Sequence, residues 1–346
     1  MHPVYIGVGR FVLSNRGGPS MCTAATYRTN DSYFGRNLDL ERSYHESVTI
    51  TPRNFRLDFR REDPMDSHLA MIGMATVANG YPLYYDATNE MGLSMAGLNF
   101  PENAVYRPEV DGMDNIATFE LIPWILGRCA TVPEAQELME RMNILNESFS
   151  PELPVSPLHW MISDTERSVV VESVEDGLKI YENPYGVLTN NPPFPYHSMN
   201  VNNYMGLSRN QPENRFSKDI PMDRYSRGMG GIGMPGDLSS ASRFVRAAFV
   251  RANSVSGFSE SESVSQFMHI LGSVSQQRGC VDVGGGAYEI SIYTSCCNVN
   301  KGLYYYTTYE NSRISCVDMY MEDLDGSELV SYGLVQGQDI LYVNRR

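Results

Sequence analysis

Short apolar runs alternate with turn residues along the first hundred residues after position 21, and this pattern is typical of strands. The runs are rich in Thr, Val, Ile and aromatic residues, and turn signals such as Asn30-Asp31 and Asn79-Gly80 separate them. The pattern predicts strands over 22–29, 33–38, 47–51, 70–77, 83–85 and 93–100.

The apolar period changes to that of a helix near residue 115. Pro123 lies inside the first such run, so a kink or a helix that starts near it is expected. Capping-box patterns at 131–134 and 259–262 indicate two further helix starts. Apolar residues at helical spacing within 239–253 indicate a further helix. The four predicted helices are therefore 115–129, 131–142, 239–253 and 259–271.

The remaining chain combines strands with one long irregular segment. Residues 190–236 are rich in Asn, Pro, Gly and Tyr, which predicts a long ordered excursion with a short helix near 199–205. Strands grouped between pairs of helices favour mainly antiparallel sheets covered by helical layers, since the βαβ alternation of a parallel sheet is missing. The other strands are expected over 159–163, 168–173, 178–181, 288–297, 302–308, 312–319 and 340–344.

Composition and charge narrow the class of protein. The 346 residues are 42% hydrophobic and 20% charged, which is typical of a globular protein with room for one large or two ordinary domains. The net charge of −14 argues against a nucleic-acid-binding surface, because phosphate contacts need clustered Lys and Arg. No apolar run approaches the ~18–20 residues that a membrane span needs.

Cysteine and histidine usage predicts neither disulfides nor a metal site. The six cysteines have irregular spacing and form no CxxC pattern, so they are interpreted as reduced thiols of a cytoplasmic protein. The six histidines are scattered, with no HExxH motif. We therefore expect no metal site.

The segment 1–21 is interpreted as lying outside the fold. Arg10 divides its apolar residues into two runs, so neither forms the ~7–15-residue core of a signal peptide. It is a leader, a mis-assigned start or a remnant of expression.

Cys22 is the first candidate for chemistry. If everything before it were removed, one residue would carry both a thiol and an α-amine, and that amine titrates near ~7.7–8. A nucleophile whose base is its own N-terminus is a known catalytic arrangement. On spacing alone, a small buried residue in a first strand is the more common outcome.

The string FGRNLD at 34–39 is the second candidate. Strand alternation places Asn37 and Asp39 on one face, with Arg36 and Leu38 on the other. A twist or bulge at the strand end would let Arg36 and Asp39 converge, whereas an ordinary surface ion pair is the common alternative.

These strings resemble the choloylglycine hydrolase family, which contains bile salt hydrolases and penicillin V acylases. The similarity runs in order from residue 21 to the C-terminus. It is carried by MCT (21–23), FGRNLD (34–39), TPRNF (51–55), AGLNF (96–100), LHWMISD (158–164), GVLTNNP (186–192), LSRNQ (207–211), PGD (235–237), ASRF (241–244), YTSC (293–296) and YYYTTY (304–309).

The resemblance implies an α+β N-terminal nucleophile (Ntn) hydrolase fold, a four-layer αββα sandwich of two mainly antiparallel sheets flanked by helices. It implies one domain over 22–346, with an assembly excursion at about 199–236. The implied reaction is hydrolysis of an amide bond without metal or cofactor. The implied assembly is a homotetramer.

The resemblance also assigns roles to catalytic residues. Cys22 would be the nucleophile and its amine the base, Asp39 would hold that amine, and Arg36 would favour the thiolate. Two asparagines and one arginine, which the spacing alone would not have selected, match further positions of the family. Asn99 and Asn190 would lie near the oxyanion and the scissile amide, and Arg243 would face the site from the start of a helix.

The expected substrates are glycine- or taurine-conjugated bile acids, cleaved through a thioester on Cys22. Asn99 favours this branch, because the acylase-like members resemble one another in having Tyr there. An apolar wall for the steroid would include Leu38, Leu158 and Phe149, although ordinary core packing would also explain all three. Penicillin V or another N-acyl amide remains the alternative substrate, and a non-catalytic binding protein the alternative class if residues 1–21 are retained.

Overall fold

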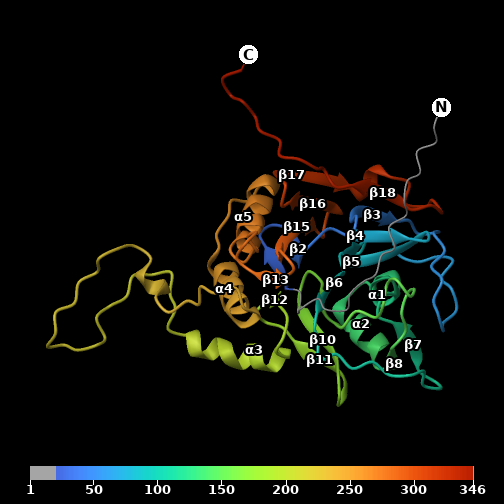
Figure 1. The fold of residues 1–346 in the computed structure, drawn as a ribbon, viewed down its shortest axis with the longest axis horizontal. Coiled ribbons are helices and arrows are strands. Elements are labelled where there is room, and N and C mark those ends of the chain that lie inside the picture. Colours follow the sequence, from blue (N-terminus) through green and yellow to red (C-terminus); the bar gives the residue numbers. More distant parts are fainter. Residues whose placement is uncertain (1–20, 346) are drawn as a thin grey trace.

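Two large sheets packed face to face form the centre of the computed structural model, which describes residues 21–345 (Figure 1). The prediction made for residues 1–20 lies outside the described residues. All neighbouring strands within each of these sheets are antiparallel. The six-stranded sheet consists, in order, of β12 (Val187–Leu188), β1 (Cys22–Arg28), β2 (Ser32–Leu40), β15 (Ile290–Asn298), β16 (Leu303–Thr308) and β17 (Asn311–Asp318). The eight-stranded sheet consists of β11 (Gly177–Glu182), β10 (Ser168–Val174), β9 (Leu158–Ser163), β6 (Ser94–Asn99), β5 (Tyr81–Asn89), β4 (Met71–Ala78), β3 (Ser47–Thr51) and β18 (Val330–Gly333).

Helices cover the outer face of each sheet. The helices α4 (Ser240–Asn253) and α5 (Glu260–Gly272) contact β1, β2 and β15 of the six-stranded sheet. The helices α1 (Leu121–Arg128) and α2 (Val132–Met139) share an apolar cluster with the eight-stranded sheet. This confirms the α+β fold with the layer order helix, sheet, sheet, helix (Figure 1).

Alternation along β4 shows how the sequence builds these layers. Ile72 and Met74 belong to the apolar cluster that lies between the sheets and extends beneath α4 and α5. Met71 and Ala75 belong to the cluster beneath α1 and α2. Because successive side chains of a strand point to opposite faces, a strand that is buried on both faces reads as a nearly continuous apolar run.

The two predicted capping boxes differ in the structure. At α5 the box is complete: the Ser259 side chain accepts from the Glu262 backbone, and the Glu262 carboxylate accepts from the Ser259 N–H. At α2 the Thr131 hydroxyl accepts from the Glu134 N–H at 3.3 Å, but the Glu134 carboxylate accepts from the Ala130 N–H at 2.7 Å. Both arrangements satisfy N–H groups that a helix start leaves free.

Three sequence predictions need correction. The segment expected as a helix over 115–129 begins as a strand, β7 (Asp114–Ala117), paired in parallel with β8 (Met142–Leu145), and α1 starts only at Leu121. The helix expected near 199–205 lies earlier, as α3 (Phe194–Val201), and continues into a 3-10 turn over 202–204. The strand expected over 340–344 is wrong, because the structure places β18 ten residues earlier, paired with β3.

The excursion between α3 and α4 projects away from the body of the molecule (Figure 1). A second small addition is a hairpin formed by β13 (Asp282–Gly284) and β14 (Ala287–Tyr288). Among residues 21–345, no helix has the length and apolar character that crossing a bilayer requires.

Glu120, just before α1, predicts a pH dependence of stability. Its carboxylate is buried and accepts the backbone N–H groups of Arg60 and Ala117 at 2.6 and 2.9 Å. Burial raises the pKa of Glu120 to about 7. Glu120 in the unfolded chain loses its proton near the ordinary pKa of a glutamate, whereas in the folded state it keeps that proton up to about pH 7. The free energy of unfolding therefore falls as pH rises between these two pKa values.

Between about pH 5 and pH 8, we expect this free energy to fall by about 2 kcal/mol more in the unmodified protein than in Glu120→Gln. Urea unfolding at both pH values measures the difference. The matched control is Glu137→Gln, at an exposed position on α2. Identical pH dependence in the unmodified protein and Glu120→Gln would contradict the assignment.

Candidate active site

Cys22 begins β1, which lies between β12 and β2. Cys22 pairs with Leu38 and Thr23 pairs with Asn37. Residues directly opposite one another in an antiparallel pair share a face. Cys22, Leu38 and Arg36 therefore lie on the face toward the second sheet, whereas Thr23 and Asn37 lie on the face toward α4 and α5.

Arg36 crosses from the six-stranded sheet to the eight-stranded sheet. It is fully buried, and its Nη1 donates to the carbonyls of Tyr85 at 2.9 Å and Gly97 at 2.5 Å. Burial raises the pKa of the Cys22 thiol above its usual value, and the Arg36 charge is the strongest opposing influence. Among the groups around Cys22, the Arg36 charge thus does most to lower the thiol pKa, and the catalytic role that the resemblance implies for it stays a prediction.

A buried carboxylate that sequence reasoning missed lies near Arg36. Asp86 of β5 accepts hydrogen bonds from the hydroxyls of Tyr293 at 2.6 Å and Tyr304 at 2.7 Å. Burial raises the pKa of Asp86, and the Arg36 charge opposes this shift. The YYYTTY string contains Tyr304, one of the hydrogen-bond partners of Asp86. Nothing in the local sequence indicated that Tyr304 and Asp86 would meet, because they lie on strands far apart in the chain.

Asp39 approaches the Cys22 thiol through its backbone. The ladder between β2 and β15 shifts register between Ser291 and Tyr293, at the end of β2 where a bulge was considered. The Asp39 backbone N–H lowers the pKa of the Cys22 thiol, and the Ser291 hydroxyl donates to Asp39 Oδ1 at 2.5 Å. Within the described chain, Asp39 Oδ2 is buried and has no hydrogen-bond partner. Burial raises the pKa of Asp39 to about 6, against the lowering effect of the Arg243 charge.

Asn190 and Arg243 surround the backbone of Cys22. The Cys22 nitrogen donates to Asn190 Oδ1 at 2.7 Å, and Arg243 Nη2 donates to the same oxygen at 2.8 Å. Arg243 Nη1 donates to the Cys22 carbonyl at 2.6 Å and to the Thr23 hydroxyl at 2.7 Å. Although it lies in the first turn of α4, Arg243 is fully buried and faces the site, as expected.

Asn99 joins the same arrangement from the second sheet. It ends β6, and its carbonyl accepts from Asn190 Nδ2 at 2.8 Å. The structure thus brings together all six residues expected from the resemblance: Cys22, Arg36, Asp39, Asn99, Asn190 and Arg243. In this structure the Cys22 nitrogen is held by Asn190, whereas Asp39 had been expected to hold it.

Glu289 is a second buried carboxylate that the sequence did not reveal. It precedes β15 and accepts the backbone N–H of Met21, the residue attached to Cys22. Burial raises the pKa of Glu289 to about 7, and the nearby Asp39 charge acts in the same direction. Glu289 follows a glycine-rich turn that carried no signal for chemistry.

The three residues expected in a substrate wall lie in different surroundings. Leu38 pairs with Cys22, and Leu158 pairs with Asn99 across β6 and β9. Phe149 packs 5.2 Å from the ring of Phe119, and the Arg60 guanidinium lies 5.7 Å from its centroid. The contacts described for Phe149 join it to neither Cys22 nor Leu38.

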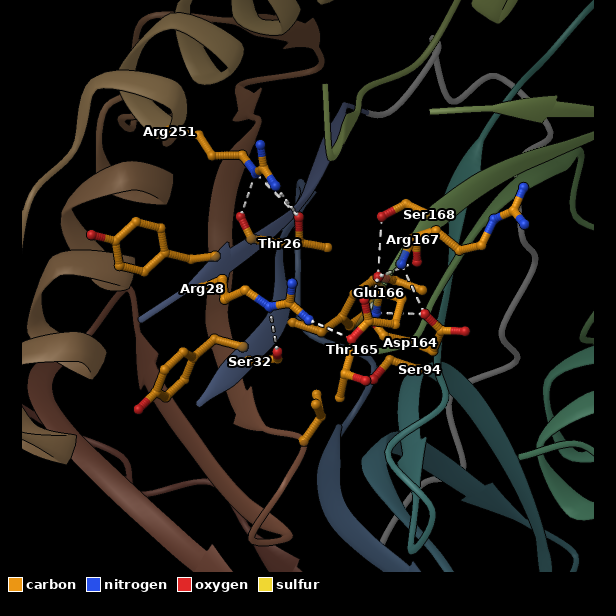
Figure 2. Close-up of a pocket in the computed structure, with 15 residues that line it drawn as sticks. Thr26, Arg28, Ser32, Ser94, Asp164, Thr165, Glu166, Arg167, Ser168 and Arg251 are labelled. Carbon is orange, nitrogen blue, oxygen red and sulfur yellow. Dashed lines mark hydrogen bonds and ion pairs between the residues drawn. The ribbon is translucent and has the colours of Figure 1, made fainter. Parts of the chain in front are cut away.

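Two surface cavities lie outside this group of residues. One, shown in Figure 2, is lined by Thr26, Arg28, Ser94 and the 163–168 turn, and an Arg28–Glu166 ion pair of 3.0 Å crosses it. It lies at the far end of β1, roughly 20 Å from Cys22 at ~3.3 Å per residue. The other, of about 230 Å³, is lined by residues of α5, β15 and β16 that include Ser291, the partner of Asp39.

The described residues contain no group of three or more His, Cys, Asp or Glu arranged to hold a metal ion. What the arrangement offers instead is nucleophilic chemistry. A thiol lies beside a guanidinium, and the nitrogen of the same residue lies beside a carboxamide oxygen. Nucleophile and candidate base are therefore close to each other and to amide donors.

Known proteins are similar to this chain in both sequence and fold. A model of the linear amide C–N hydrolases, choloylglycine hydrolase family, matches residues 22–332. A protein of Lactiplantibacillus plantarum named bile salt hydrolase/transferase is 55% identical over 314 residues, covering 91% of this chain and 97% of that protein. A Clostridium perfringens protein of the same name is 38% identical, over 94% of this chain and all of that one.

Solved structures agree. A mutant of the conjugated bile acid hydrolase of Clostridium perfringens superposes with a TM-score of 0.87 at 37% identity, covering 93% of this chain and 100% of that one. Penicillin V acylase from Agrobacterium tumefaciens superposes with a TM-score of 0.70 over 93% of this chain and 94% of that one, at 19% identity, which supports the fold alone. Sequence, architecture and the assembled residues around Cys22 point the same way, and the chain belongs to the choloylglycine hydrolase family of linear amide C–N hydrolases.

Proposed function

We propose that this protein is a bile salt hydrolase, which cleaves the amide bond of glycine- or taurine-conjugated bile acids through a thioester on Cys22. The observation that carries the proposal is the arrangement around Cys22. The Arg36 charge and the Asp39 backbone both lower the pKa of its thiol, while its nitrogen donates to Asn190 Oδ1 at 2.7 Å. The thiol of Cys22 as nucleophile and its α-amine as base thus belong to one residue and lie close together.

The mechanism needs Cys22 to carry a free amine, as it does when residues 1–21 are removed. That amine takes the thiol proton as the sulfur attacks the amide carbon of the substrate. It then gives a proton to the departing nitrogen of glycine or taurine as the C–N bond breaks. Water attacks the thioester carbonyl, the amine again accepts a proton, and the bile acid carboxylate leaves as the C–S bond breaks.

The neighbouring groups supply what a free amine would need. A peptide nitrogen has one hydrogen, which Asn190 Oδ1 accepts here, whereas an amine brings additional hydrogens. The unpartnered, buried Oδ2 of Asp39 is the acceptor that we assign to one of them. Arg243 fixes both Asn190 Oδ1 and the Cys22 carbonyl, so it orients the nucleophile.

The oxyanion is assigned to the two asparagines. Asn190 Nδ2 has two hydrogens, and the Asn99 carbonyl accepts only one of them. The second hydrogen, with the carboxamide of Asn99, is proposed to bind the developing negative charge. A donor of this kind contributes roughly 2.7–4 kcal/mol to lowering the barrier.

We infer conjugated bile acids as the substrate class from Asn99 and from the relatives named bile salt hydrolase/transferase. Leu38 and Leu158 are proposed to form the apolar wall nearest the thioester, since they pair with Cys22 and Asn99. Phe149, together with Phe119, is assigned to a more distant part of that wall.

The test is to compare turnover of glycocholate, taurocholate and penicillin V by one preparation that begins at Cys22. We expect both bile salts to be hydrolysed faster than penicillin V. Penicillin V hydrolysed far faster than both would reject the proposal in favour of acylase activity. No turnover of any of the three would instead favour a binding protein.

The excursion is proposed to mediate a homotetramer. Its exposed apolar residues include Met205, Phe216, Ile220, Met222, Tyr225 and Ile232, and a projecting segment with so much exposed apolar surface is typical of a contact site. Multi-angle light scattering measures the mass directly, and a monomer would contradict this assignment. A reducing, cytoplasmic location is proposed from the six cysteines, all of which are free thiols.

A further inference from the structure

Two buried histidines that the proposed reaction does not use contact the backbone at Thr189 and Asn190. His159 of β9 and His197 of α3 are both fully buried. His159 Nε2 lies 2.8 Å from the Thr189 carbonyl, and His197 Nε2 lies 2.8 Å from the Asn190 carbonyl. A carbonyl oxygen only accepts, so both Nε2 atoms carry a hydrogen and donate it. Two imidazoles therefore hold two consecutive carbonyls.

Each imidazole also stacks on a ring that adjoins another site residue. His159 stacks on Phe100, which follows Asn99, with centroids 4.3 Å apart and planes at 7°. His197 stacks on Phe244, which follows Arg243, with centroids 4.7 Å apart and planes at 15°. The two histidines thus connect the backbone around Asn190 to the segments that carry Asn99 and Arg243.

The carboxylate of Glu172 contacts both His159 and the first residue of α3. Glu172 of β10 is fully buried, and its Oε1 lies 3.1 Å from His159 Nδ1 and 2.8 Å from the Phe194 N–H. Because His159 Nε2 already carries a hydrogen, one more proton must lie between Nδ1 and Oε1, and the pair as a unit is neutral. Burial costs such a neutral, hydrogen-bonded pair far less than two isolated charges.

His197 is locked in one tautomer. Burial lowers its pKa to about 4, so its imidazole is neutral near pH 7. In the part of the chain that the structure describes, its Nδ1 has no hydrogen-bond partner. The single hydrogen of this ring is therefore the one on Nε2, which the Asn190 carbonyl accepts.

We propose that His159 and His197 are positioning residues of the active site, which hold the Asn190 backbone so that its carboxamide is aimed at the Cys22 nitrogen and the oxyanion. This rests on the proposed function. Asn190 Oδ1 must meet the Cys22 nitrogen and Arg243 at once, and Nδ2 must meet the Asn99 carbonyl. A rotation of the peptide at Asn190 would break all three contacts together, and a misplacement of about 1 Å can cost about 100-fold in rate.

The test compares two replacements at each histidine. His197→Phe and His159→Phe keep an aromatic ring for stacking but remove the donor, whereas His197→Gln and His159→Gln keep an N–H₂ group near the place of Nε2. With glycocholate, we expect the Phe variants to lose about 10- to 100-fold in kcat, with KM changed less than about threefold. The Gln variants should recover at least about tenfold of that loss.

Three further measurements separate positioning from folding. The rate at which iodoacetamide alkylates Cys22 should stay within about twofold of the unmodified protein, because the donors act on Asn190 and not on the thiol. The matched control is His269→Gln, at an exposed position on α5, which should keep full turnover. A thermal melt of every variant identifies any that fails to fold. Where a Phe variant fails to fold, the kcat of the Gln variant at that histidine alone tests the positioning role.

Phe variants with unchanged kcat would overturn the proposal, and so would Gln and Phe variants that lose activity equally. A Gln variant that also fails to fold would assign that histidine to stability alone and overturn its positioning role. The unmodified protein tests the function separately. If it hydrolyses penicillin V but not glycocholate, bile salt hydrolysis is rejected, and the ratios between variants are then measured with penicillin V.

Discussion

Replacing Cys22 with alanine is expected to lower kcat for glycocholate by about 10⁴-fold or more, because the proposed mechanism needs its thiol to form the covalent bond to the acyl group. The nearby Thr23 hydroxyl already accepts from Arg243 and lies on the opposite face of the strand. The fold should survive, since alanine fits a buried strand position and leaves the backbone contacts of Cys22 with Asn190 and Arg243 intact.

Steady-state release of glycine measures the effect, and Cys280→Ala, an exposed thiol elsewhere, is the matched control that should keep full activity. Mass spectrometry of acid-quenched enzyme adds a second measurement: the unmodified protein should carry a bile acyl adduct, and Cys22→Ala should carry none. Activity of Cys22→Ala above a tenth of normal would refute a cysteine mechanism.

Keeping Cys22 in a peptide bond is expected to have the second-largest effect, a loss of about 10²–10⁴-fold in kcat, which is the contribution of a general base. Inserting one alanine between Met21 and Cys22 achieves this even when all preceding residues are removed. The thiol remains, with Arg36 beside it, but the nitrogen of Cys22 becomes an amide that cannot accept a proton.

N-terminal sequencing must accompany this measurement, so that each rate belongs to a known first residue. Alkylation of Cys22 by iodoacetamide should remain detectable in the insertion variant, which would show that only the base was lost. Full turnover by a chain with Ala before Cys22 would mean that another group acts as the base, and Glu289, which already accepts the Met21 N–H, would be the first to examine.

Much of the sandwich could be predicted because its signals are local. Alternating apolar residues, turn dipeptides and capping boxes act within a few residues, and they located most strands and both long helices. The strand β7 was missed because its parallel partner β8 lies far along the chain, with Asp114 paired to Met142, and the helical spacing next to β7 obscured it. Residues 340–344 have the composition of a strand, but β18 is the segment that pairs with the open edge at β3.

The active site was predictable only in part, for a similar reason. The FGRNLD string carried Arg36 and Asp39 together, and the resemblance located Asn99, Asn190 and Arg243. Asp86 and Glu289 had no such signal, because each acquires its role from partners more than 200 residues away in sequence. His159 and His197 carried no local signal either, because the Thr189 and Asn190 carbonyls that they contact belong to a different segment from each histidine's own strand or helix.

The position of Arg36 has a consequence for how the protein becomes active. Its charge favours the Cys22 thiolate from within the first sheet, yet carbonyls of the second sheet hold its guanidinium. A chain in which the two sheets have not yet docked leaves this guanidinium in water, where screening removes most of its effect on the thiol. The influence of Arg36 that offsets part of the effect of burial on the thiol pKa therefore exists only once both sheets have formed and packed.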